Sequence, residues 1–182
     1  INNFKKNKYL ASQNKHLVDG NGIKRINFFV KNNKTNKISL EKISSADIDL
    51  LFMWVNDKTV RQNSFSVKKI AFQDHTRWLK KKLSNKKTIF LKLMIDGLPV
   101  GQIRFDIKKN FYYLDYSIDE AFRNLGFGSF IIKKSIQKYI KKKQKIRADV
   151  KKTNLNSIKI FQSLNFKEIK NSPYKRSFVL ST

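Results

Sequence analysis

Hydrophobic and polar residues alternate with different periods along the first half of the chain. The stretch 37–43 (KISLEKI) predicts a first strand, and the four residues after it offer a helix start before the apolar run 48–55. Residues 56–70 have little periodicity, which predicts a loop or a short helical turn. A second helix, up to Asn85, is predicted by residues at helical spacing: Phe72, His75, Trp78, Leu79 and Leu83.

Strand-like runs dominate the second half. Three of them follow in close succession, separated by the turn signals Asp96-Gly97 and Lys109-Asn110: 88–95, 99–107 and 111–118. Two helices and three strands are predicted after them, which in chain order cover 127–140, 145–150, 154–164, 166–169 and 176–180. This order predicts a mixed α/β sheet in which antiparallel strands precede a strand–helix–strand unit.

Composition is that of one folded domain behind a polar extension. Of 182 residues, 40% are hydrophobic and 15 are phenylalanine, which is enough to bury a core. Residues 1–36 are polar and rich in Asn and Lys, so we expect an extension there and a globular domain over 37–182. The sequence has no apolar run long enough for a membrane span and no signal-peptide pattern, so a cytoplasmic protein is expected. With no cysteine and two histidines, we expect no metal site.

The net charge of +27 invites a nucleic-acid-binding interpretation. However, the 40 basic residues comprise 33 Lys and only 7 Arg, and Arg is the residue that reads base edges. Lysine is spread along the whole chain and does not form one patch. We therefore expect no nucleic-acid partner, but a surface that attracts anionic ligands such as nucleotides.

Two glycines one residue apart, Gly126 and Gly128, follow a predicted strand and open a basic amphipathic helix. Glycine lets the backbone approach a ligand closely, and the first turn of a helix presents unpaired N–H groups that favour anions. The Gly-Lys-Ser/Thr of a P-loop is absent, and the hairpins before the glycines differ from a Rossmann unit. The pattern is typical of a phosphate cradle, and a simple turn with a helix cap is the alternative.

Two segments resemble the signatures of the GNAT superfamily of acyl-CoA N-acyltransferases. SIDEAFRNLGFG (117–128) is similar to its pyrophosphate loop, Arg/Gln-x-x-Gly-x-Gly/Ala. VKKTNLNSIKIFQSLNF (150–166) is similar to its second signature, in which an Asn, here Asn154, follows the fifth strand. The resemblance covers residues 37–181. It implies a mixed, mostly antiparallel sheet flanked by helices, with fourth and fifth strands that splay apart.

The resemblance also implies acetyl-CoA as the acyl donor. A backbone N–H near Tyr116 would polarise the thioester carbonyl, and Arg123 would add charge at the pyrophosphate. Backbone N–H groups for the pyrophosphate would come from Asn124, Leu125, Gly126, Phe127 and Gly128. Further contacts to the donor would come from Tyr116, Ser117, Ile118, Asn154, Ser157 and Phe161.

One position departs from the family pattern. Phe161 stands where many members place a tyrosine that protonates the departing CoA thiolate. Either another group acts or none is needed, because a thiol with a pKa near ~8.5 leaves tolerably as a thiolate. General acid help is worth roughly 10²–10⁴-fold, so its loss would be partial. An inactive acyltransferase is the alternative.

The acceptor must attack as a neutral amine, so a base is expected. Asp115 on the fourth strand and His75 on the second helix are the candidates, directly or through a water. Each also fits a structural role, His75 as a packing residue and Asp115 as a solvated strand residue.

The segment 53–83 stands where this superfamily builds its acceptor wall. It resembles the N-acetyltransferases of nonulosonic (pseudaminic) acid biosynthesis, which acetylate the 4-amino group of a UDP-linked 4-amino-4,6-dideoxy sugar. Arg77, other cations and stacking aromatics such as Trp78 would hold the UDP, although core packing is the alternative for the aromatics. The acceptor contacts that the resemblance implies are Trp54, Arg61, Asn63, Ser64, Phe65, His75 and Arg104.

Residues 11–26 (ASQNKHLVDGNGIKRI) are similar to the closing segment of the UDP-sugar hydrolase of the same pathway. They predict that the chain is the C-terminal part of a hydrolase–acetyltransferase fusion, with an unrelated polar extension as the alternative. A protein N-terminal or ribosomal-protein acetyltransferase is the rival activity, but it would need an acidic channel, and only 13 acidic residues face 40 basic ones. A nucleic-acid-binding module and a non-catalytic acyl-CoA-binding domain are the rivals from other classes.

Overall fold

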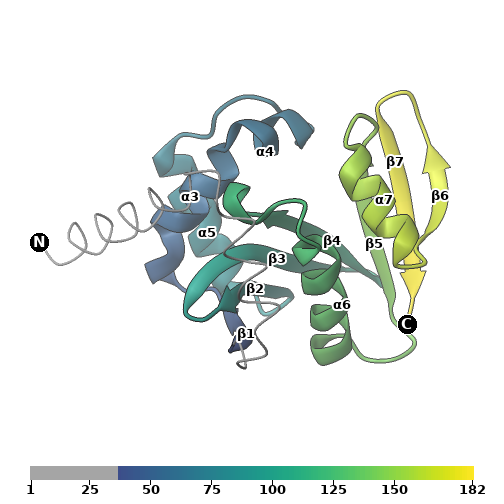
Figure 1. The fold of residues 1–182 in the computed structure, drawn as a ribbon, viewed down its shortest axis with the longest axis horizontal. Coiled ribbons are helices and arrows are strands. Elements are labelled where there is room, and N and C mark those ends of the chain that lie inside the picture. Colours follow the sequence, from purple (N-terminus) through teal and green to yellow (C-terminus); the bar gives the residue numbers. More distant parts are fainter. Residues whose placement is uncertain (1–36) are drawn as a thin grey trace, which may run out of the picture. The chain divides into compact units, whose positions relative to one another are not determined.

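A computed structural model describes residues 37–182, so the predicted extension over 1–36 and its likeness to a hydrolase lie outside the described residues. The described part contains a seven-stranded sheet in the order β1-β2-β3-β4-β5-β7-β6. Its ladders from β2 to β6 are antiparallel, except that β4 and β5 run parallel (Figure 1). The predicted mixed α/β sheet is therefore confirmed.

The elements alternate much as the hydrophobic pattern predicts. In chain order they are β1 (Ile38–Lys42), η1 (Ser45–Asp47), α3 (Ile48–Asn56), α4 (Lys58–Asn63), α5 (Phe72–Ser84), β2 (Thr88–Ile95), β3 (Leu98–Lys108), β4 (Phe111–Ile118), η2 (Glu120–Phe122), α6 (Phe127–Tyr139), β5 (Lys145–Lys151), α7 (Leu155–Ser163), β6 (Lys167–Asn171) and β7 (Lys175–Ser181).

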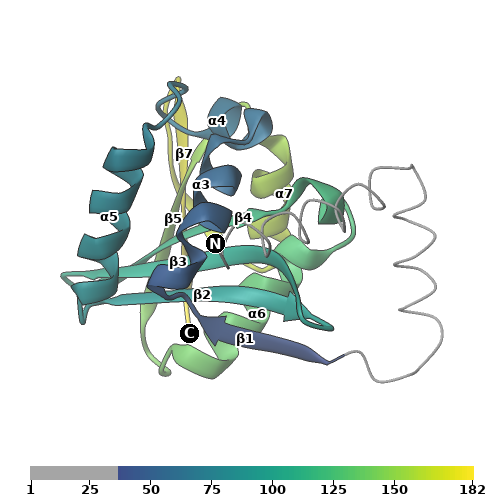
Figure 2. The same ribbon diagram turned by 90° about the vertical axis from the view of Figure 1, so that its left-hand side faces the viewer.

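Helices cover both faces of the sheet, and Figure 2 shows α5 and α6 on opposite sides of the strands. Successive side chains of a strand point to opposite faces. On the α6 face, Ile103 and Phe105 of β3 pack under Ile131 and Ile132 of α6, and all four are fully buried. Each such side chain contributes roughly 1.5–3 kcal/mol on burial. On the α5 face, a second apolar cluster comprises Ile43, Leu51, Trp54, Leu79 and Phe90.

Both predicted hairpin turns are confirmed, and each needs a left-handed residue. Asp96 and Gly97 have φ values of 49° and 80°, and Lys109 has a φ of 51°. The first strand of the last hairpin starts one residue later than predicted, at Lys167, because Phe166 is buried (4% exposed) before the strand begins. Within residues 37–182, no helix is long and apolar enough to cross a membrane.

Candidate active site

The parallel strands β4 and β5 separate at the centre of the sheet. They pair only along Phe111–Tyr113 and Lys145–Arg147, while β4 continues to Ile118 and β5 to Lys151. No strand of the described chain pairs with β4 on this side beyond Tyr113. The splay of the fourth and fifth strands, predicted from the family resemblance, is present in the structure.

Backbone groups of β4 face this opening. The Asp119 N–H donates to the Val100 carbonyl over 2.9 Å, so these two residues are a hydrogen-bonded pair of the β3–β4 ladder. Such pairs alternate with pairs whose backbone groups point outward. The N–H and C=O groups of Leu114, Tyr116 and Ile118 therefore point towards β5, which places the Tyr116 N–H in the opening.

A cavity of about 690 Å³ extends from the opening towards α4 and α5. Of the residues that the sequence predicted to contact the donor or the acceptor, all line it except Leu125 and Phe127, whose predicted role used the backbone alone, and Arg77, which lies on the surface. No group of three or more potential metal ligands lies within residues 37–182.

The two glycines do different work beside the opening. Gly126 has a φ of 84° and Asn124 a φ of 62°, so the loop needs left-handed backbone at both positions. Gly128 has ordinary helical backbone, but a Cβ there would lie 2.9 Å from Ile160 Cδ1 and 3.3 Å from Tyr116 Cε2. Gly126 thus serves the turn, and Gly128 lets β4, α6 and α7 approach one another.

The start of α6 presents free backbone donors. The first N–H to find a helical acceptor is that of Phe130, which donates to the Gly126 carbonyl over 3.1 Å. The N–H groups of the three preceding residues have no acceptor in the helix ladder. Together with the positive end of the helix dipole, they form a cradle for an anion.

Arg123 lies at this loop but already holds two groups. Its Nε donates to the Ile118 carbonyl (3.0 Å), and its NH2 group donates to Asp57 Oδ1 (2.6 Å). The predicted contribution of charge at the pyrophosphate is thus shared with an internal carboxylate.

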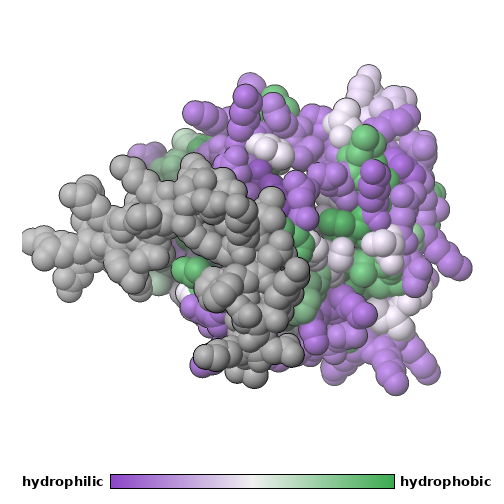
Figure 3. Space-filling view, in the orientation of Figure 1, coloured by the Kyte–Doolittle hydropathy of each residue, from purple (hydrophilic) through white to green (hydrophobic). Residues whose placement is uncertain are grey.

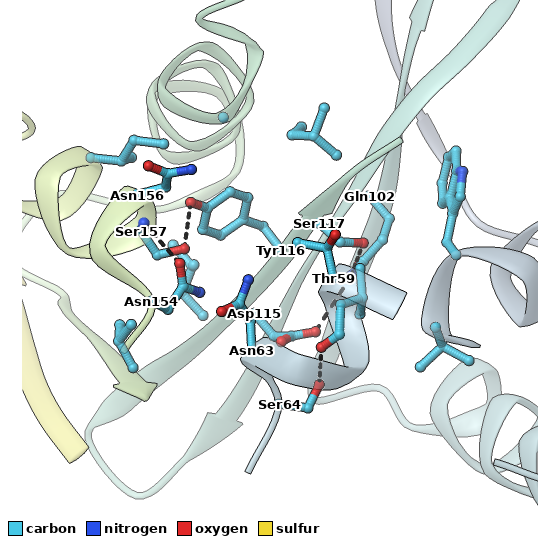
Figure 4. A pocket seen from close by; sticks show the side chains of 18 of the residues that line it. Thr59, Asn63, Ser64, Gln102, Asp115, Tyr116, Ser117, Asn154, Asn156 and Ser157 are labelled. Atoms are coloured by element: carbon cyan, nitrogen blue, oxygen red, sulfur yellow. Dashed lines mark hydrogen bonds between the residues drawn. The ribbon is translucent and has the colours of Figure 1, made fainter. Parts of the chain in front are cut away.

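Three polar side chains meet on the α6–α7 side of the opening (Figure 4). The Tyr116 hydroxyl lies 3.0 Å from Ser157 Oγ, and Asn154 Oδ1 accepts the Ser157 N–H over 3.2 Å as the cap of α7. Burial raises the pKa of Tyr116 to about 12, although the hydrogen bond with Ser157 opposes the rise. Tyr116 therefore stays protonated and can donate at any working pH.

Phe161 is a packing residue. It is 2% exposed, its ring stacks on Phe178 with centroids 5.8 Å apart, and it meets the edge of Phe166 at 5.0 Å. The Tyr116 ring lies 5.9 Å away. A hydroxyl is thus present beside Phe161, supplied by β4 and not by α7.

The opposite face of β3 and β4 carries a polar row that the sequence analysis assigned only in part. Gln102 Nε2 donates to Asp115 Oδ2 (3.4 Å) and Ser117 Oγ (3.3 Å), as Figure 4 shows. Arg104 NH2 lies 3.5 Å from Asp115, and its guanidinium stacks over Trp78 at 5.0 Å. Sequence analysis missed Gln102, although strand alternation places it on the same face as Arg104.

His75 is buried among aromatic rings and is hardly accessible from the cavity. It is 2% exposed, and its ring stacks on Trp78 (5.5 Å) and meets Phe52 (5.7 Å). Burial lowers the pKa of His75, against a weaker effect of a hydrogen bond with the Ile48 backbone, so the imidazole is neutral near pH 7. Its Nε2 has no partner within the described residues. These contacts favour the structural role over that of the base.

The segment predicted to form the acceptor wall contains a loop held by two side chains. Arg61 donates to the Ser66 and Lys68 carbonyls and to Ser64 Oγ. Asn56 makes two hydrogen bonds with the Ile70 backbone, at 3.0 and 2.8 Å. Arg61 thus organises the loop, while Arg77 pairs with Asp74 on the surface and does not line the cavity.

Among the charged side chains that line the cavity, cations outnumber carboxylates. Figure 3 shows hydropathy on one face of the molecule, where hydrophilic residues surround smaller apolar areas. Carboxylates in the cavity lining are Asp115 and Asp149, and the cations that line it are Arg61, Arg104, Arg123, Lys151 and Lys159. Sequence analysis missed the two lysines, since nothing in the sequence distinguishes them from the many other lysines of the chain.

Comparison with known proteins identifies the fold and the family. A model described as the acetyltransferase (GNAT) family matches residues 54–166. The chain belongs to the GNAT acetyltransferase family. It is therefore an acetyltransferase that takes its acetyl group from acetyl-CoA. No curated protein sequence matches the chain significantly.

Solved structures similar to this GNAT enzyme share its fold at low identity. An acetyltransferase from Thermus thermophilus has a TM-score of 0.70 and 16% identity, covering 80% of this chain and 97% of its own. The N-acetyltransferase PseH from Campylobacter jejuni has a TM-score of 0.59 and 21% identity, covering 80% and 98%. The spermidine N-acetyltransferase from Vibrio cholerae, solved with CoA and spermine, has a TM-score of 0.68 and 12% identity, covering 79% and 94%.

The residues around the opening fit an acyl-CoA. The Tyr116 N–H offers a donor in the opening, and the start of α6 offers several donors to a diphosphate. Because Gly128 has no side chain, α6 lies close to Tyr116 and Ile160 beside these donors.

Proposed function

We propose that this GNAT enzyme acetylates the 4-amino group of a UDP-linked 4-amino-4,6-dideoxy sugar, as in nonulosonic or pseudaminic acid biosynthesis. The observation that carries the proposal is the cavity with its excess of cations beside the loop 64–71. Arg61 and Asn56 hold the backbone of this loop, and Phe65 exposes its ring there. The resemblance of residues 53–83 to that group of enzymes, noted from the sequence, and the fold shared with PseH also support the proposal.

The loop after α4 has the chemistry of a nucleotide-diphosphate site. Phe65 lines the cavity and is 59% exposed, so its ring is free to stack on a uracil. Lys68 and Lys69 lie on the same loop outside the cavity lining; both are exposed and pair with no carboxylate within residues 37–182, so they add positive charge to the loop. Because Arg61 and Asn56 fix the loop backbone, little entropy is lost when it binds a ligand.

Residues on the two faces of β4 serve the two substrates. Asp115 and Ser117 point to the α4–α5 face, where the acceptor wall stands, while Tyr116 points to the α6–α7 face. The acceptor amine then meets the Asp115 carboxylate, which is 55% exposed and oriented by Gln102 and Arg104. Asp115 is the base that we assign.

The remaining groups act on the donor side. Acetyl-CoA supplies the thioester, whose carbonyl gains negative charge as the amine attacks. The Tyr116 N–H donates to that oxygen, and the Tyr116 hydroxyl, oriented by Ser157, donates to the departing sulfur. The α6 N–H groups and one face of Arg123 hold the diphosphate.

The predicted fusion with a UDP-sugar hydrolase stays a prediction, as does the cytoplasmic location. The fusion agrees with the proposed substrate, because both activities would handle UDP-linked sugars of one pathway. Its test is UDP release from a UDP-sugar by the fusion protein that this prediction requires.

The activity is tested by thiol release from acetyl-CoA, followed with a chromogenic thiol reagent. The protein has no cysteine, so it adds no background. Release that depends on a UDP-4-amino-4,6-dideoxy sugar, and exceeds release with spermidine or with an N-terminal peptide of a ribosomal protein, supports the proposal. Asp115→Asn should abolish most of it, while the matched exposed change Asp49→Asn should not. Release that is fastest with either rival acceptor refutes the sugar assignment.

A further inference from the structure

Two polar contacts join segments more than 60 residues apart in sequence on the rim of the cavity. The Trp54 indole N–H donates to Asp119 Oδ2 over 2.6 Å, and Arg123 NH2 donates to Asp57 Oδ1 over 2.6 Å. Trp54 is 5% exposed, and the side chains of Arg123 and Asp57 are 23% and 18% exposed. Being mostly desolvated, these contacts are stronger than pairs on an open surface.

Each carboxylate does two jobs. Asp57 accepts the Val60 N–H (2.9 Å) and so caps α4, while the same oxygen holds Arg123. Asp119 accepts the Ala121 N–H (2.9 Å) and so caps η2, while its other oxygen holds Trp54. The start of α4 is therefore held to the end of η2, and the start of η2 is held to α3.

The two segments that these contacts join belong to the proposed binding sites of different substrates. η2 runs directly into the glycine loop 124–128, the proposed diphosphate cradle. α4 carries Thr59 and Asn63 into the cavity and leads to the loop of Phe65. Arg123 also holds the Ile118 carbonyl at the end of β4, so one guanidinium joins the diphosphate loop, the opening and the acceptor helix.

We infer that Asp57 and Arg123, with Trp54 and Asp119, are positioning residues that couple the two substrate sites. Arg123 NH1 has no partner within residues 37–182, so it remains available to an anion at the loop. An anion held there orders Arg123, Arg123 holds Asp57, and Asp57 holds the first turn of α4. Binding of the CoA diphosphate thereby stabilises the first turn of α4, at the start of the acceptor wall. The inference rests on the proposed use of the glycine loop, but not on the identity of the acceptor.

The coupling is measured by hydrogen–deuterium exchange of the full chain, with free CoA as the probe. CoA should slow amide exchange in 124–130, where it binds, and about fivefold or more in 58–63. Asp57→Asn is the decisive variant, because asparagine caps a helix as well as aspartate does and loses only the charge. We expect it to keep protection at 124–130 and to lose much of it at 58–63, because a neutral amide oxygen accepts from Arg123 more weakly than a carboxylate does. Asp49→Asn, the same chemical change on exposed α3, should keep both.

A second variant guards against a local folding defect. Arg123→Lys keeps the positive charge at the loop but lacks the fork that holds Ile118 and Asp57 together. At saturating CoA it too should show protection of 124–130 and lose that of 58–63, although its weaker contact with the diphosphate should raise the CoA concentration that saturation needs.

The outcomes separate the inference from the proposal on which it rests. Protection of 58–63 that persists in both variants means that CoA touches α4 directly, and the coupling is wrong. Protection confined to 124–130 in the unmodified chain overturns it as well. If CoA binds without protecting 124–130, the proposed cradle itself fails.

Discussion

Removing the Tyr116 hydroxyl tests which group replaces the tyrosine missing at position 161. In Tyr116→Phe the ring and its contact with Phe161 (5.9 Å) remain, while the hydroxyl beside Ser157 (3.0 Å) disappears. A hydrogen bond to a charged group is worth about 1.5–3 kcal/mol. At about 1.4 kcal/mol per factor of ten, kcat should fall roughly 10- to 160-fold.

The pH profile gives an independent signature. With its pKa raised to about 12, mainly by burial, Tyr116 keeps its proton throughout the range in which the enzyme works. We therefore expect that ionisation of Tyr116 causes no fall of kcat below about pH 11, so Tyr116→Phe should leave the shape of the pH profile unchanged. The variant should be slower by the same factor at every pH tested.

The assay is thiol release at saturating acetyl-CoA and acceptor, with the affinity for CoA measured by calorimetry. Ser157→Ala, which removes only the orienting partner, should lose less activity than Tyr116→Phe. Tyr113→Phe is the matched control, because it removes a hydroxyl from the same strand outside the cavity lining. A kcat within twofold of the unmodified enzyme for Tyr116→Phe would show that the thiolate leaves without this donor.

Three further predictions concern the loop, the buried histidine and the acceptor wall. Gly126→Ala should lower the free energy of denaturant unfolding by about 1–2 kcal/mol, because Gly126 has a φ of 84°. Gly128→Ala should change this free energy by no more than ~1 kcal/mol, since the better helix propensity of alanine offsets its contact with the flexible Ile160 side chain. Burial depresses the pKa of His75 below its unfolded value near 6.5. The unfolded chain therefore takes up this proton more readily than the folded protein, and stability falls as pH drops below about 6.5. His75→Phe should make the fall of Tm between about pH 7 and 5 less steep. Phe65→Ala should weaken UDP binding in calorimetry by roughly 5- to 150-fold, for about 1–3 kcal/mol of stacking, and leave CoA binding unchanged.

Local sequence patterns predicted most of the fold, because the hydrophobic periods of strands and helices can be recognised from residues close together in the sequence. The two left-handed hairpin turns and the start of α6 at Phe127 follow from turn residues and apolar stripes. The short helix α4 was only half predicted, since none of its residues is buried and its start depends on the Asp57 cap.

The site was less predictable where its geometry depends on distant partners. Arg123 looks from sequence like a free cation at a phosphate loop, yet Asp57, 66 residues away, holds it. Arg61 looks like a ligand for a diphosphate, yet three groups of the following loop occupy it. Contacts of this kind arise only when the chain folds, and neither periodicity nor spacing reports them.

Phe161 shows the opposite case, in which a sequence departure gains meaning from the structure. The missing hydroxyl suggests a defective site when the helix is considered alone. In the folded protein, Tyr116 brings a hydroxyl from β4 to Ser157, next to the buried Phe161 ring. The strand and the helix thus supply together what the helix lacks.

The central claim is acetyl transfer to a sugar amine, and product analysis tests it most directly. The full chain is incubated with isotopically labelled acetyl-CoA and a UDP-4-amino-4,6-dideoxy sugar, and the nucleotide sugar is analysed by mass spectrometry and NMR. We predict one labelled acetyl group per sugar, present as an amide on the C4 nitrogen. An unchanged nucleotide sugar, under conditions where the enzyme acetylates another amine, would contradict the account.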